Sequence, residues 1–330
     1  MSEPPVLEIR DLHVTFTAHG REVPAVRGVD LTIERGQTLA LLGESGSGKS
    51  VTAKAVMGLL DQPNVRVRCE TARLGGRDLL TMAPDERRAL RGSAMTLVFQ
   101  DALSALNPVL SIGDQIGELY RVHQRLSRRQ ARERSIEMLN LVGIPAPAKR
   151  IDDYPHQFSG GMRQRILVAM AVALEPDLII ADEPTTALDV TVQAQILELI
   201  DRLRQELGTA VLLITHDLGV AAEVSDRVSV MYAGRIVESG QVDELYDLPA
   251  HPYTAALLAA IPDLDSPASE LRAIPGAPPS PSEVPPGCSF APRCERASEV
   301  CTTTRPPLTL LPAGTGRHTA CHHSEEMLNA

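Results

Sequence analysis

The stretch that decides the fold is Gly43–Ser50, with the sequence GESGSGKS. The apolar run before it, Thr38–Leu42, predicts a buried strand, and Val51–Leu60 predicts a helix that begins near Lys49. A helix start carries partial positive charge, and glycines let the backbone turn its N–H groups toward an anion. The pattern of Gly, four residues and Gly-Lys-Ser therefore predicts a loop that binds the phosphates of a nucleoside triphosphate.

Each position in this loop has an expected task. Gly43, Gly46 and Gly48 have no Cβ, so the backbone can approach phosphate oxygens closely. We expect the Lys49 ammonium to reach the β- and γ-phosphates and the Ser50 hydroxyl to bind Mg²⁺. A flexible Ser/Gly loop is the alternative interpretation, and the flanking strand and helix argue against it.

The composition is that of a soluble globular chain. At 330 residues, with 43% hydrophobic and 22% charged residues, it can bury a sizeable core and hold one large domain and a smaller one. The net charge of −10 argues against a nucleic-acid partner. Since no apolar run approaches the roughly 18 residues that cross a bilayer, and residues 1–10 lack a signal pattern, we expect a cytosolic protein.

The apolar pattern predicts an α/β fold. Leu7–Phe16 and Val29–Ile33 alternate apolar and polar residues, as half-buried antiparallel strands do. Three further runs are continuously apolar, which favours a parallel sheet covered by helices; they are Thr96–Phe99, Leu178–Ala181 and Ala210–Ile214.

Two later segments have clear signatures. Val190–Leu207 carries its apolar residues on one helical stripe and is followed by Gly208, a typical helix-ending residue. Arg227–Gly240 is typical of a hairpin that turns at Ala233-Gly234.

Changes in composition predict the domain organisation. Residues 1–260 are expected to form one nucleotide-binding domain, with a helical insertion at about residues 101–160. Prolines recur from Pro262 to Pro286, so residues 261–330 are expected to form a proline-rich extension that carries most of the cysteines.

A second phosphate-site element follows the run LIIA. Asp182 ends this predicted strand at the sheet edge where open α/β sheets bind ligands, and its carboxylate suits Mg²⁺. Glu183 comes next and is expected to act as a general base toward the attacking water. Two solvated acids at a strand end are the alternative interpretation.

Several further motifs together resemble those of ABC-type ATPases. Phe158–Met162 (FSGGM) resembles the signature loop that is usually written LSGGQ. In chain order the matching positions are Gln100 for the Q-loop, Ser159, Gly160 and Gly161 for the signature, Asp189 for the D-loop (Ala187-Leu188-Asp189) and His216 for the switch histidine. The ordered set resembles the ATP-binding subunit of an ABC transporter and implies an ABC-type P-loop NTPase fold, with a RecA-like core, an antiparallel β subdomain and a helical subdomain.

The resemblance implies ATP and Mg²⁺ as ligands and gives each site residue a role. The implied ATP contacts are Phe16, Gly43, Ser45, Gly46, Gly48, Lys49, Ser50, Val51, Ser159, Gly160, Gly161, Asp182 and Asp189. The implied catalytic residues are Glu183, His216 and Gln100, and the implied Mg²⁺ ligands are Ser50, Gln100 and Asp182. Phe16 would stack on adenine, although a core position is the alternative. Phe158 and Met162 depart from the family signature without changing its Ser-Gly-Gly centre.

The family mechanism implies partners. Two ATPase domains pair head to tail, each ATP lies between the glycine loop of one and the signature loop of the other, and hydrolysis opens the pair. The implied partners are a second ABC ATPase subunit in a heterodimer, two transmembrane permeases and an extracytoplasmic peptide-binding protein. The chain would lie peripherally on the cytoplasmic face of the membrane.

Three segments resemble the oligopeptide/dipeptide importer ATPases in particular. They are Phe158–Arg165, Gln100–Pro108 and the His251–Thr254 segment (HPYT). The subfamily often reads QDP at the Q-loop, where this chain has Ala102. ATPases of importers for another small solute, such as nickel or glutathione, remain the alternative. A soluble ABC protein that acts on ribosomes or DNA is disfavoured by the single cassette and the acidic charge.

The extension carries cysteines whose pattern resembles that of the C-terminal region of these ATPases. They are Cys288, Cys294, Cys301 and Cys321. Gaps of five, six and nineteen residues disfavour a zinc knuckle. Such a loose loop fits four thiolates around an iron–sulfur cluster. The resemblance implies a 4Fe–4S cluster here, which would staple the extension, with zinc or bare thiols as alternatives. Cys69 is expected to be a buried apolar residue, and His318, His322 and His323 are expected to be exposed tail residues.

Overall fold

In the computed structural model the described residues are 3–18, 20–99, 105–185, 189–260, 274–311 and 316–329. They fall into two compact units. The first unit comprises Met1–Leu7, Ile33–Gln37 and Arg73–Leu212; the second comprises Glu8–Thr32, Thr38–Ala72 and Leu213–Ala330. Gln100, Ala102, Ala187 and Leu188 lie outside the described residues. The predicted division at residue 260 stays a prediction.

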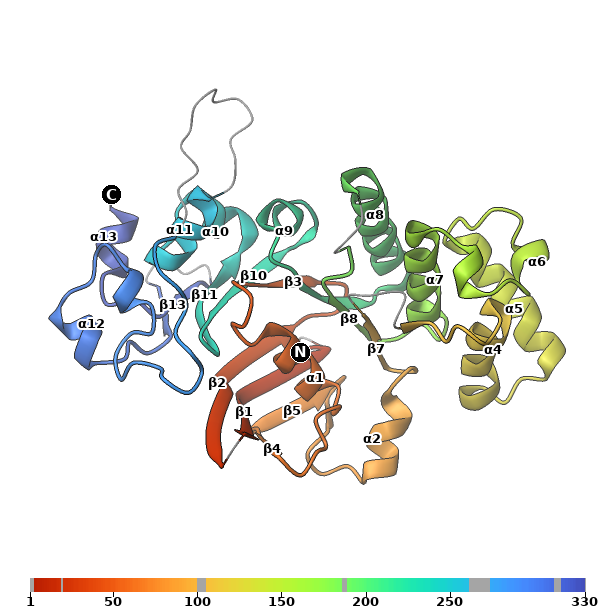
Figure 1. Ribbon diagram of the computed structural model, residues 1–330, viewed down its shortest axis with the longest axis horizontal. Helices are drawn as coiled ribbons and strands as arrows, with labels where there is room; N and C mark the ends of the chain where they lie inside the picture. The colour runs from red at the N-terminus through yellow and green to blue at the C-terminus, as the bar shows by residue number, and fades with distance from the viewer. Residues whose placement is uncertain are drawn as a thin grey trace. The chain divides into compact units, whose positions relative to one another are not determined.

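The first unit combines parallel strands with most of the long helices (Figure 1). Its elements are β6 (Arg77–Asp78), α2 (Pro84–Leu90), β7 (Met95–Val98), α4 (Ile112–His123), α5 (Arg128–Leu141), α6 (Pro147–Arg150), the 3₁₀ turn η1 (Pro155–Gln157), α7 (Gly160–Val172), β8 (Leu178–Asp182), α8 (Val190–Leu207) and the start of β9 (Ala210–Ile214). Strands β9, β8 and β7 lie in that order, and β7 and β8 pair in parallel. The predicted strands at β7 and β8 are therefore confirmed, each to within one residue.

The predicted helix at α8 is confirmed at both ends. The side chain of Asp189 accepts a hydrogen bond from the Val192 N–H, and Gly208 ends the helix with φ 65°. The side chains of its apolar stripe are buried, including Ile196 and Leu203. This packing stabilises the helix, since propensity alone rarely holds a helix in water.

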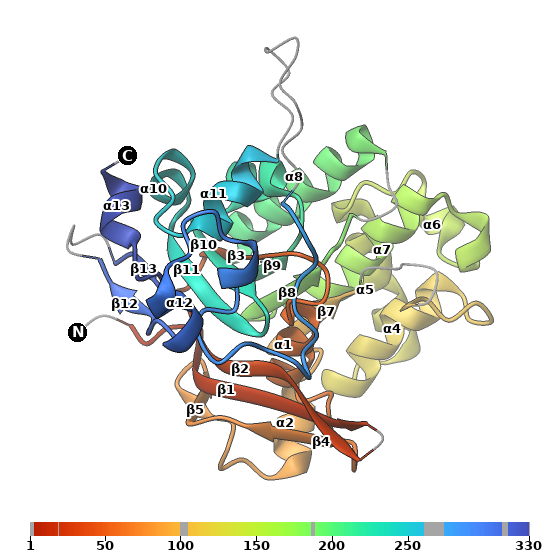
Figure 2. The same cartoon turned by 60° about the vertical axis from the view of Figure 1, so that its left-hand side comes forward.

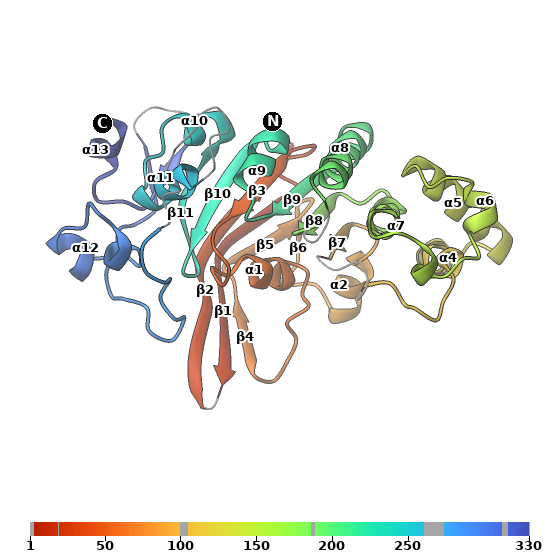
Figure 3. The ribbon, with the colours of Figure 1, turned by 45° about the horizontal axis from the view of Figure 1, so that its top comes forward.

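The second unit holds the glycine loop and the described part of the C-terminal segment (Figures 2 and 3). Its elements are β1 (Leu7–Ala18), β2 (Arg21–Ile33), β3 (Thr38–Leu42), α1 (Lys49–Val56), β4 (Val65–Arg68), β5 (Thr71–Leu74, crossing into the first unit), α9 (Leu218–Val224), β10 (Arg227–Tyr232), β11 (Arg235–Gln241), α10 (Val242–Asp247), α11 (Pro252–Ala259), the 3₁₀ turn η2 (Ala291–Arg293), α12 (Glu299–Thr303), β12 (Thr309–Leu310), β13 (His318–Thr319) and α13 (Ser324–Leu328).

Two kinds of strand pairing occur in this unit. Strand β1 pairs antiparallel with β4, and β3 pairs in parallel with β10, as the two apolar patterns predict. Strands β12, β13, β11, β10 and β3 follow one another in one sheet. The predicted hairpin is confirmed, because Ala233 (φ 45°) and Gly234 (φ 82°) form the turn between β10 and β11.

Helix α1 is shorter than the sequence pattern predicts. It begins at Lys49 as expected but ends at Val56, not Leu60. Gly58 adopts φ 63°, and its N–H donates to the Ala55 carbonyl, which closes the last turn. A glycine in this left-handed conformation ends a helix more strongly than the apolar residues after it extend it.

The C-terminal segment shares the core of the second unit. Phe290 is buried with Leu42, Val230 and Tyr253, and Ile274 packs against the same cluster. A buried ion pair fastens the end of the segment: Arg317 Nη2 lies 2.7 Å from Glu238 Oε1. The C-terminal segment is thus packed into the core of the second unit.

No helix in the described parts of the chain is both long and apolar enough to cross a membrane.

His251, the residue before α11, gives a test of this buried region. Its side chain is 1% exposed, and its Nδ1 accepts a hydrogen bond from the Tyr253 N–H. Burial lowers the pKa of His251 to about 3, whereas an unfolded histidine titrates near 6.5. As the pH falls, His251 is therefore protonated first in the unfolded chain. The contribution of His251 to the free energy of unfolding is complete above about pH 6.5 and is lost as the pH falls toward about 3.

Replacing His251 with Asn, which also caps helices, removes this titration. Between about pH 7 and about pH 5, we expect the free energy of unfolding to fall by about 2 kcal/mol more in the native chain than in His251→Asn. Urea denaturation at both pH values measures this difference. Equal losses in the two proteins would contradict a buried neutral His251.

Candidate functional site

The glycine loop lies between a fully buried strand, β3, and the helix α1. Its central residues Ser45 and Gly46 are exposed, whereas Ser47 and Lys49 are buried. Gly48 precedes the helix with φ 111°, and no side chain caps that helix end. A helix start without a side-chain cap leaves backbone N–H groups available to an anion. The loop therefore has the local geometry of a phosphate site.

Close backbone packing explains two of the glycines. A Cβ on Gly43 would lie 2.1 Å from the carbonyl oxygen of Met231, and one on Gly48 would lie 2.7 Å from the Ala25 carbonyl oxygen. Real Cβ atoms do not approach that closely, so both positions require glycine. A Cβ on Gly46, by contrast, would meet no atom within 4 Å apart from those of the adjacent residues, so this position faces open space.

Lys49 lies folded against its own loop. Its Nζ donates to the carbonyl oxygens of Gly43 (2.6 Å) and Glu44 (3.0 Å). The ammonium is thereby placed next to the loop that would hold the phosphates. Ser50 and Val51 follow on α1 and are half-buried.

Asp182 and Glu183 belong to the first unit. Asp182 is the last residue of β8 and is half-buried. Glu183 follows with φ 48°, a left-handed conformation that costs a non-glycine residue roughly 1–2 kcal/mol. Such strain persists where the surroundings fix it and is common at functional sites. The left-handed conformation of Glu183 turns the chain sharply directly after Asp182.

The signature residues also belong to the first unit and start a helix. Ser159 caps α7, its hydroxyl accepting from the Met162 N–H. A Cβ on Gly161 would lie 2.7 Å from Val192 Cγ1, so α7 packs tightly against the start of α8. Asp189 caps α8 as described above. Both Ser159 and Asp189 thus have structural roles as helix caps in addition to the roles that the motifs predict.

Two further predicted residues lie in the second unit. His216 is exposed and lies two residues after the end of β9. Phe16 lies near the end of β1, opposite Val65 of β4, and is half-buried. Its half-exposed ring is compatible with stacking on a base, and it is not a fully buried core residue.

The four cysteines of the C-terminal segment line one small cavity. The residues around it are Cys288, Cys294, Cys301, Cys321, His251, Pro252, Phe290, Ala291, His322 and His323. All four thiols are free. The backbone ties two of them together, because the Cys288 N–H donates to the Cys301 carbonyl. Residues far apart in the sequence thus converge here.

The thiols differ in their electrostatics. Burial raises the pKa of Cys288 and Cys294, and it raises that of Cys321 to about 11. Burial alone would also raise the pKa of Cys301, but hydrogen bonds from Ser298 and His323 outweigh it and lower the pKa. Among the described residues, no group of three or more His, Cys, Asp or Glu side chains has an arrangement that could hold a metal ion.

Two sequence interpretations are wrong in detail. Cys69 is half-buried, not buried, because it follows the end of β4, where its thiol donates to the carbonyls of Arg10 and Thr71. His322 and His323 are not exposed tail residues, since they border the cysteine cavity. His318 is half-buried in β13.

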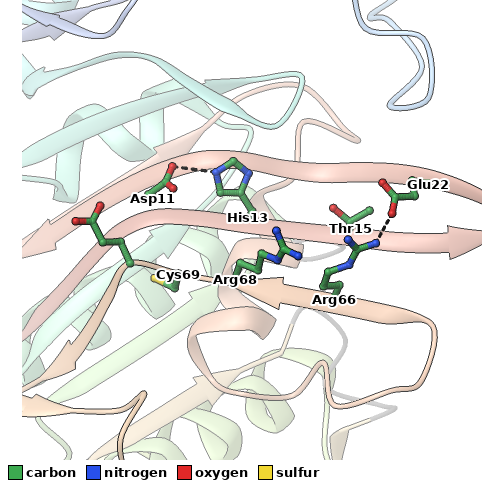
Figure 4. Close-up of a pocket in the computed structure, with 8 residues that line it drawn as sticks. Asp11, His13, Thr15, Glu22, Arg66, Arg68 and Cys69 are labelled. Atoms are coloured by element: carbon green, nitrogen blue, oxygen red, sulfur yellow. Dashed lines mark hydrogen bonds and ion pairs between the residues drawn. The ribbon is translucent and has the colours of Figure 1, made fainter.

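Figure 4 shows a further pocket, of about 540 Å³, on the antiparallel strands of the second unit. It is lined by charged side chains that largely neutralise one another. His13 Nε2 lies within hydrogen-bond distance of Asp11 Oδ1, at 2.9 Å, and Arg66 forms an ion pair with Glu22. None of the predicted phosphate-site residues lines this pocket.

Sequence reasoning missed the contacts that the C-terminal part of the chain makes to the glycine loop. The Glu44 N–H donates to the Tyr253 hydroxyl at 2.9 Å. The carboxylate of Glu44 forms an ion pair with Arg293, with Nη1–Oε2 at 2.6 Å. No sequence motif indicated this ion pair. The nearest indirect signal was that Arg293 directly precedes Cys294, one of the four cysteines singled out in the predicted extension.

The parallel strands, the glycine loop and the helix that follows it define a P-loop nucleoside-triphosphate-binding protein. Comparisons with known proteins narrow this class. The profile of the ABC transporter family matches residues 26–186, and that of the oligopeptide/dipeptide transporter C-terminal region matches residues 237–301. The solved dimeric structure of a bacterial ABC transporter cassette matches 72% of this chain and 98% of its own, with TM-score 0.63 and 27% identity.

Relatives of similar length extend the match. The dipeptide transport ATP-binding protein DppD of Bacillus subtilis is 49% identical over 92% of this chain and 91% of its own length. The oligopeptide transport ATP-binding protein OppD of the same organism is 49% identical over 92% of this chain and 85% of its own length. The chain belongs to the ABC transporter ATP-binding proteins, in the branch of the oligopeptide and dipeptide transporters. Its fold is the ABC-type P-loop NTPase fold that the motifs predicted.

The close packing at Gly43 predicts a measurable asymmetry between two glycines. Gly43→Ala should lower the free energy of unfolding by about 3 kcal/mol, because its Cβ would overlap the Met231 carbonyl. Gly46→Ala, the matched control, should lose only about 1 kcal/mol, the cost of a left-handed alanine. Urea denaturation without nucleotide tests this. Equal losses would show that the loop tolerates a side chain at Gly43.

Proposed function

We propose that this chain binds and hydrolyses ATP to power the import of dipeptides or oligopeptides through a multi-subunit ABC transporter. The observation that carries the proposal is the similarity to dipeptide and oligopeptide transport ATP-binding proteins over more than nine-tenths of the chain. The loop geometry supports it, since the open position at Gly46 and the buried Lys49 suit a triphosphate.

The proposed roles follow the motifs. Lys49 binds the β- and γ-phosphates, while Ser50, Asp182 and Gln100 bind the Mg²⁺ that accompanies ATP. Glu183 takes a proton from the attacking water. His216 contacts the γ-phosphate.

Further ATP contacts complete the site. They are proposed at Phe16 (adenine), Gly43, Ser45, Gly48 and Val51. Ser159, Gly160, Gly161 and Asp189 act toward the nucleotide of a partner ATPase, so that ATP holds the pair closed and hydrolysis releases it.

The proposed assembly contains a second ABC ATPase, two permeases and an extracytoplasmic peptide-binding protein, with this chain peripheral on the cytoplasmic face of the membrane. The support is that the relatives are named as transport ATP-binding proteins. The alternative is an importer for another small solute such as nickel or glutathione.

The proposal extends to the cysteine cavity. Cys288, Cys294, Cys301 and Cys321 would hold a 4Fe–4S cluster, with zinc as the alternative. Because these thiols do not form a metal-ion site as they lie, either ligand would require them to move closer together. The support is that all four thiols line one cavity although up to nineteen residues separate neighbours in the sequence. Thiolates are the usual ligands of such clusters. The cluster would crosslink a segment with little secondary structure.

Replacing Glu183 with Gln keeps the side-chain size and removes the base. We expect ATP hydrolysis by the assembled transporter to fall at least about 100-fold, while the Kd for Mg-ATP stays within about threefold. In cells that lack this chain, the native chain should restore uptake of labelled peptides and Glu183→Gln should not. Glu198→Gln, at an exposed position of α8, is the control.

Undiminished hydrolysis by Glu183→Gln would contradict the role of Glu183 as the base. Restored uptake of nickel or glutathione in place of peptides would favour the alternative transporter.

Anaerobic purification tests the cluster. We expect a brown protein that absorbs near 400 nm and contains about four iron and four sulfide per chain. Cys301→Ser should lose both the colour and the iron, and Cys69→Ser, outside the cavity, should keep them. A colourless protein with bound zinc would favour the zinc alternative, and one without metal would contradict both.

A further inference from the structure

Glu44, the second residue of the glycine loop, is held at three points. Its N–H donates to the Tyr253 hydroxyl at 2.9 Å, and its carbonyl accepts from Lys49 Nζ at 3.0 Å. Its carboxylate accepts two hydrogen bonds from Arg293, from Nη1 to Oε2 at 2.6 Å and from Nη2 to Oε1 at 3.0 Å. Two of these three anchors come from the C-terminal part of the chain, more than 200 residues away.

The Arg293 guanidinium is built into its position. The side chain is 5% exposed, and Nε donates to the Pro275 carbonyl at 2.8 Å. Its planar group also lies over the rings of Tyr232 and Phe290, about 6 Å from each centroid. The hydrogen bonds to Glu44 raise the pKa of Arg293, so the guanidinium stays charged. Two-pronged pairs of this kind fix the geometry of both partners.

The turn that carries Arg293 lies between two of the cavity cysteines, Cys288 and Cys294. Turn η2 starts directly after Phe290, and the Ala291 N–H donates to the Cys288 carbonyl at 3.1 Å. At its other end the Cys294 N–H donates to the Ala291 carbonyl at 3.2 Å. The backbones of both cysteines are therefore hydrogen-bonded to the turn that positions the guanidinium, so a shift of either backbone would shift the turn.

We propose that Arg293 is a positioning residue for the phosphate-binding loop and that it makes ATP affinity depend on the state of the cysteine site. The proposal rests on the proposed function of the loop as the ATP site. Arg293 holds Glu44, and the Glu44 carbonyl in turn holds Lys49, the residue that would bind the phosphates. If the cysteine site is distorted, Arg293 would lose its contact with Glu44, and Glu44 would then hold Lys49 less firmly. The loop would be less ordered in the nucleotide-free protein. The entropy lost when the loop becomes ordered on ATP binding would then lower the affinity for ATP.

The test measures Mg-ATP binding to the full chain by isothermal titration calorimetry. Arg293→Ala should raise the Kd about tenfold, the size expected from losing a charge-assisted pair. Arg293→Lys, which keeps the charge without the planar fork, should raise it less. Arg296→Ala, at an exposed arginine three residues on, should leave the Kd unchanged. In the assembled transporter KM should rise more than kcat falls, because Arg293 touches no reacting atom.

A double-mutant cycle separates positioning from general stability. If Arg293 acts through Glu44, then Glu44→Ala and the Glu44→Ala/Arg293→Ala pair should each raise the Kd by about the same tenfold. If the fold-changes of the two single variants instead multiply in the double variant, so that its Kd rises about 100-fold, the proposal is overturned. Cys294→Ser should raise the Kd in the native background and have no further effect in Arg293→Ala. An unchanged Kd in the native background would remove the link to the cysteine site.

Two outcomes keep the proposals distinct. If the native chain binds no Mg-ATP, the proposed function fails. If it binds and folded Arg293→Ala binds equally tightly, only the role of Arg293 fails. Should Arg293→Ala not fold, as judged by circular dichroism, Tyr253→Phe replaces it, because it deletes only the hydroxyl that accepts from the Glu44 N–H. If Tyr253→Phe binds Mg-ATP as tightly as the native chain, the proposal that the contacts of Glu44 position the phosphate-binding loop is overturned.

Discussion

The glycine loop depends on one close approach, that of Gly43 to the carbonyl of Met231. A side chain would bring a Cβ to 2.1 Å of that oxygen, so the loop can lie against β10 only because Gly43 has none. The Gly234 N–H donates to the Ser47 carbonyl at 2.8 Å and fastens the same loop to the β10–β11 turn. The strands of the second unit thus set the shape of the loop before any ligand is present, and a preformed loop loses less entropy on binding.

The C-terminal segment contributes to the loop as well as to its own cavity. The chain has few aromatic side chains, five Tyr, four Phe and no Trp, yet Tyr232, Tyr253 and Phe290 pack together with centroids 4.5–5.4 Å apart. Tyr253 and Arg293 reach the loop from this cluster. Since the buried pair of Arg317 and Glu238 holds the far end of the segment, the segment is part of the unit's structure and not an appendage.

Local signals predicted most of the elements. The helix α8 was predictable because its apolar stripe and the glycine that follows it agree, and such agreement is rare by chance. The Asp189 cap at its start was seen only in the structure. Helix α1 was predicted too long because Gly58 outweighs the apolar residues beyond it. The exposure of His322 and His323 was misjudged, since burial depends on what the tail packs against, and no local pattern carries that information.

The sequence by itself determined the nucleotide class and the order of motifs, because short spacings such as Gly-Lys-Ser after a strand specify a backbone geometry directly. It also determined that four cysteines lie in the extension. Only the tertiary structure decided that these thiols share a cavity, that Glu44 pairs with Arg293, and that the extension packs into the core beside β10. These contacts join residues up to about 250 positions apart, and side-chain packing in three dimensions, not periodicity along the chain, selects them.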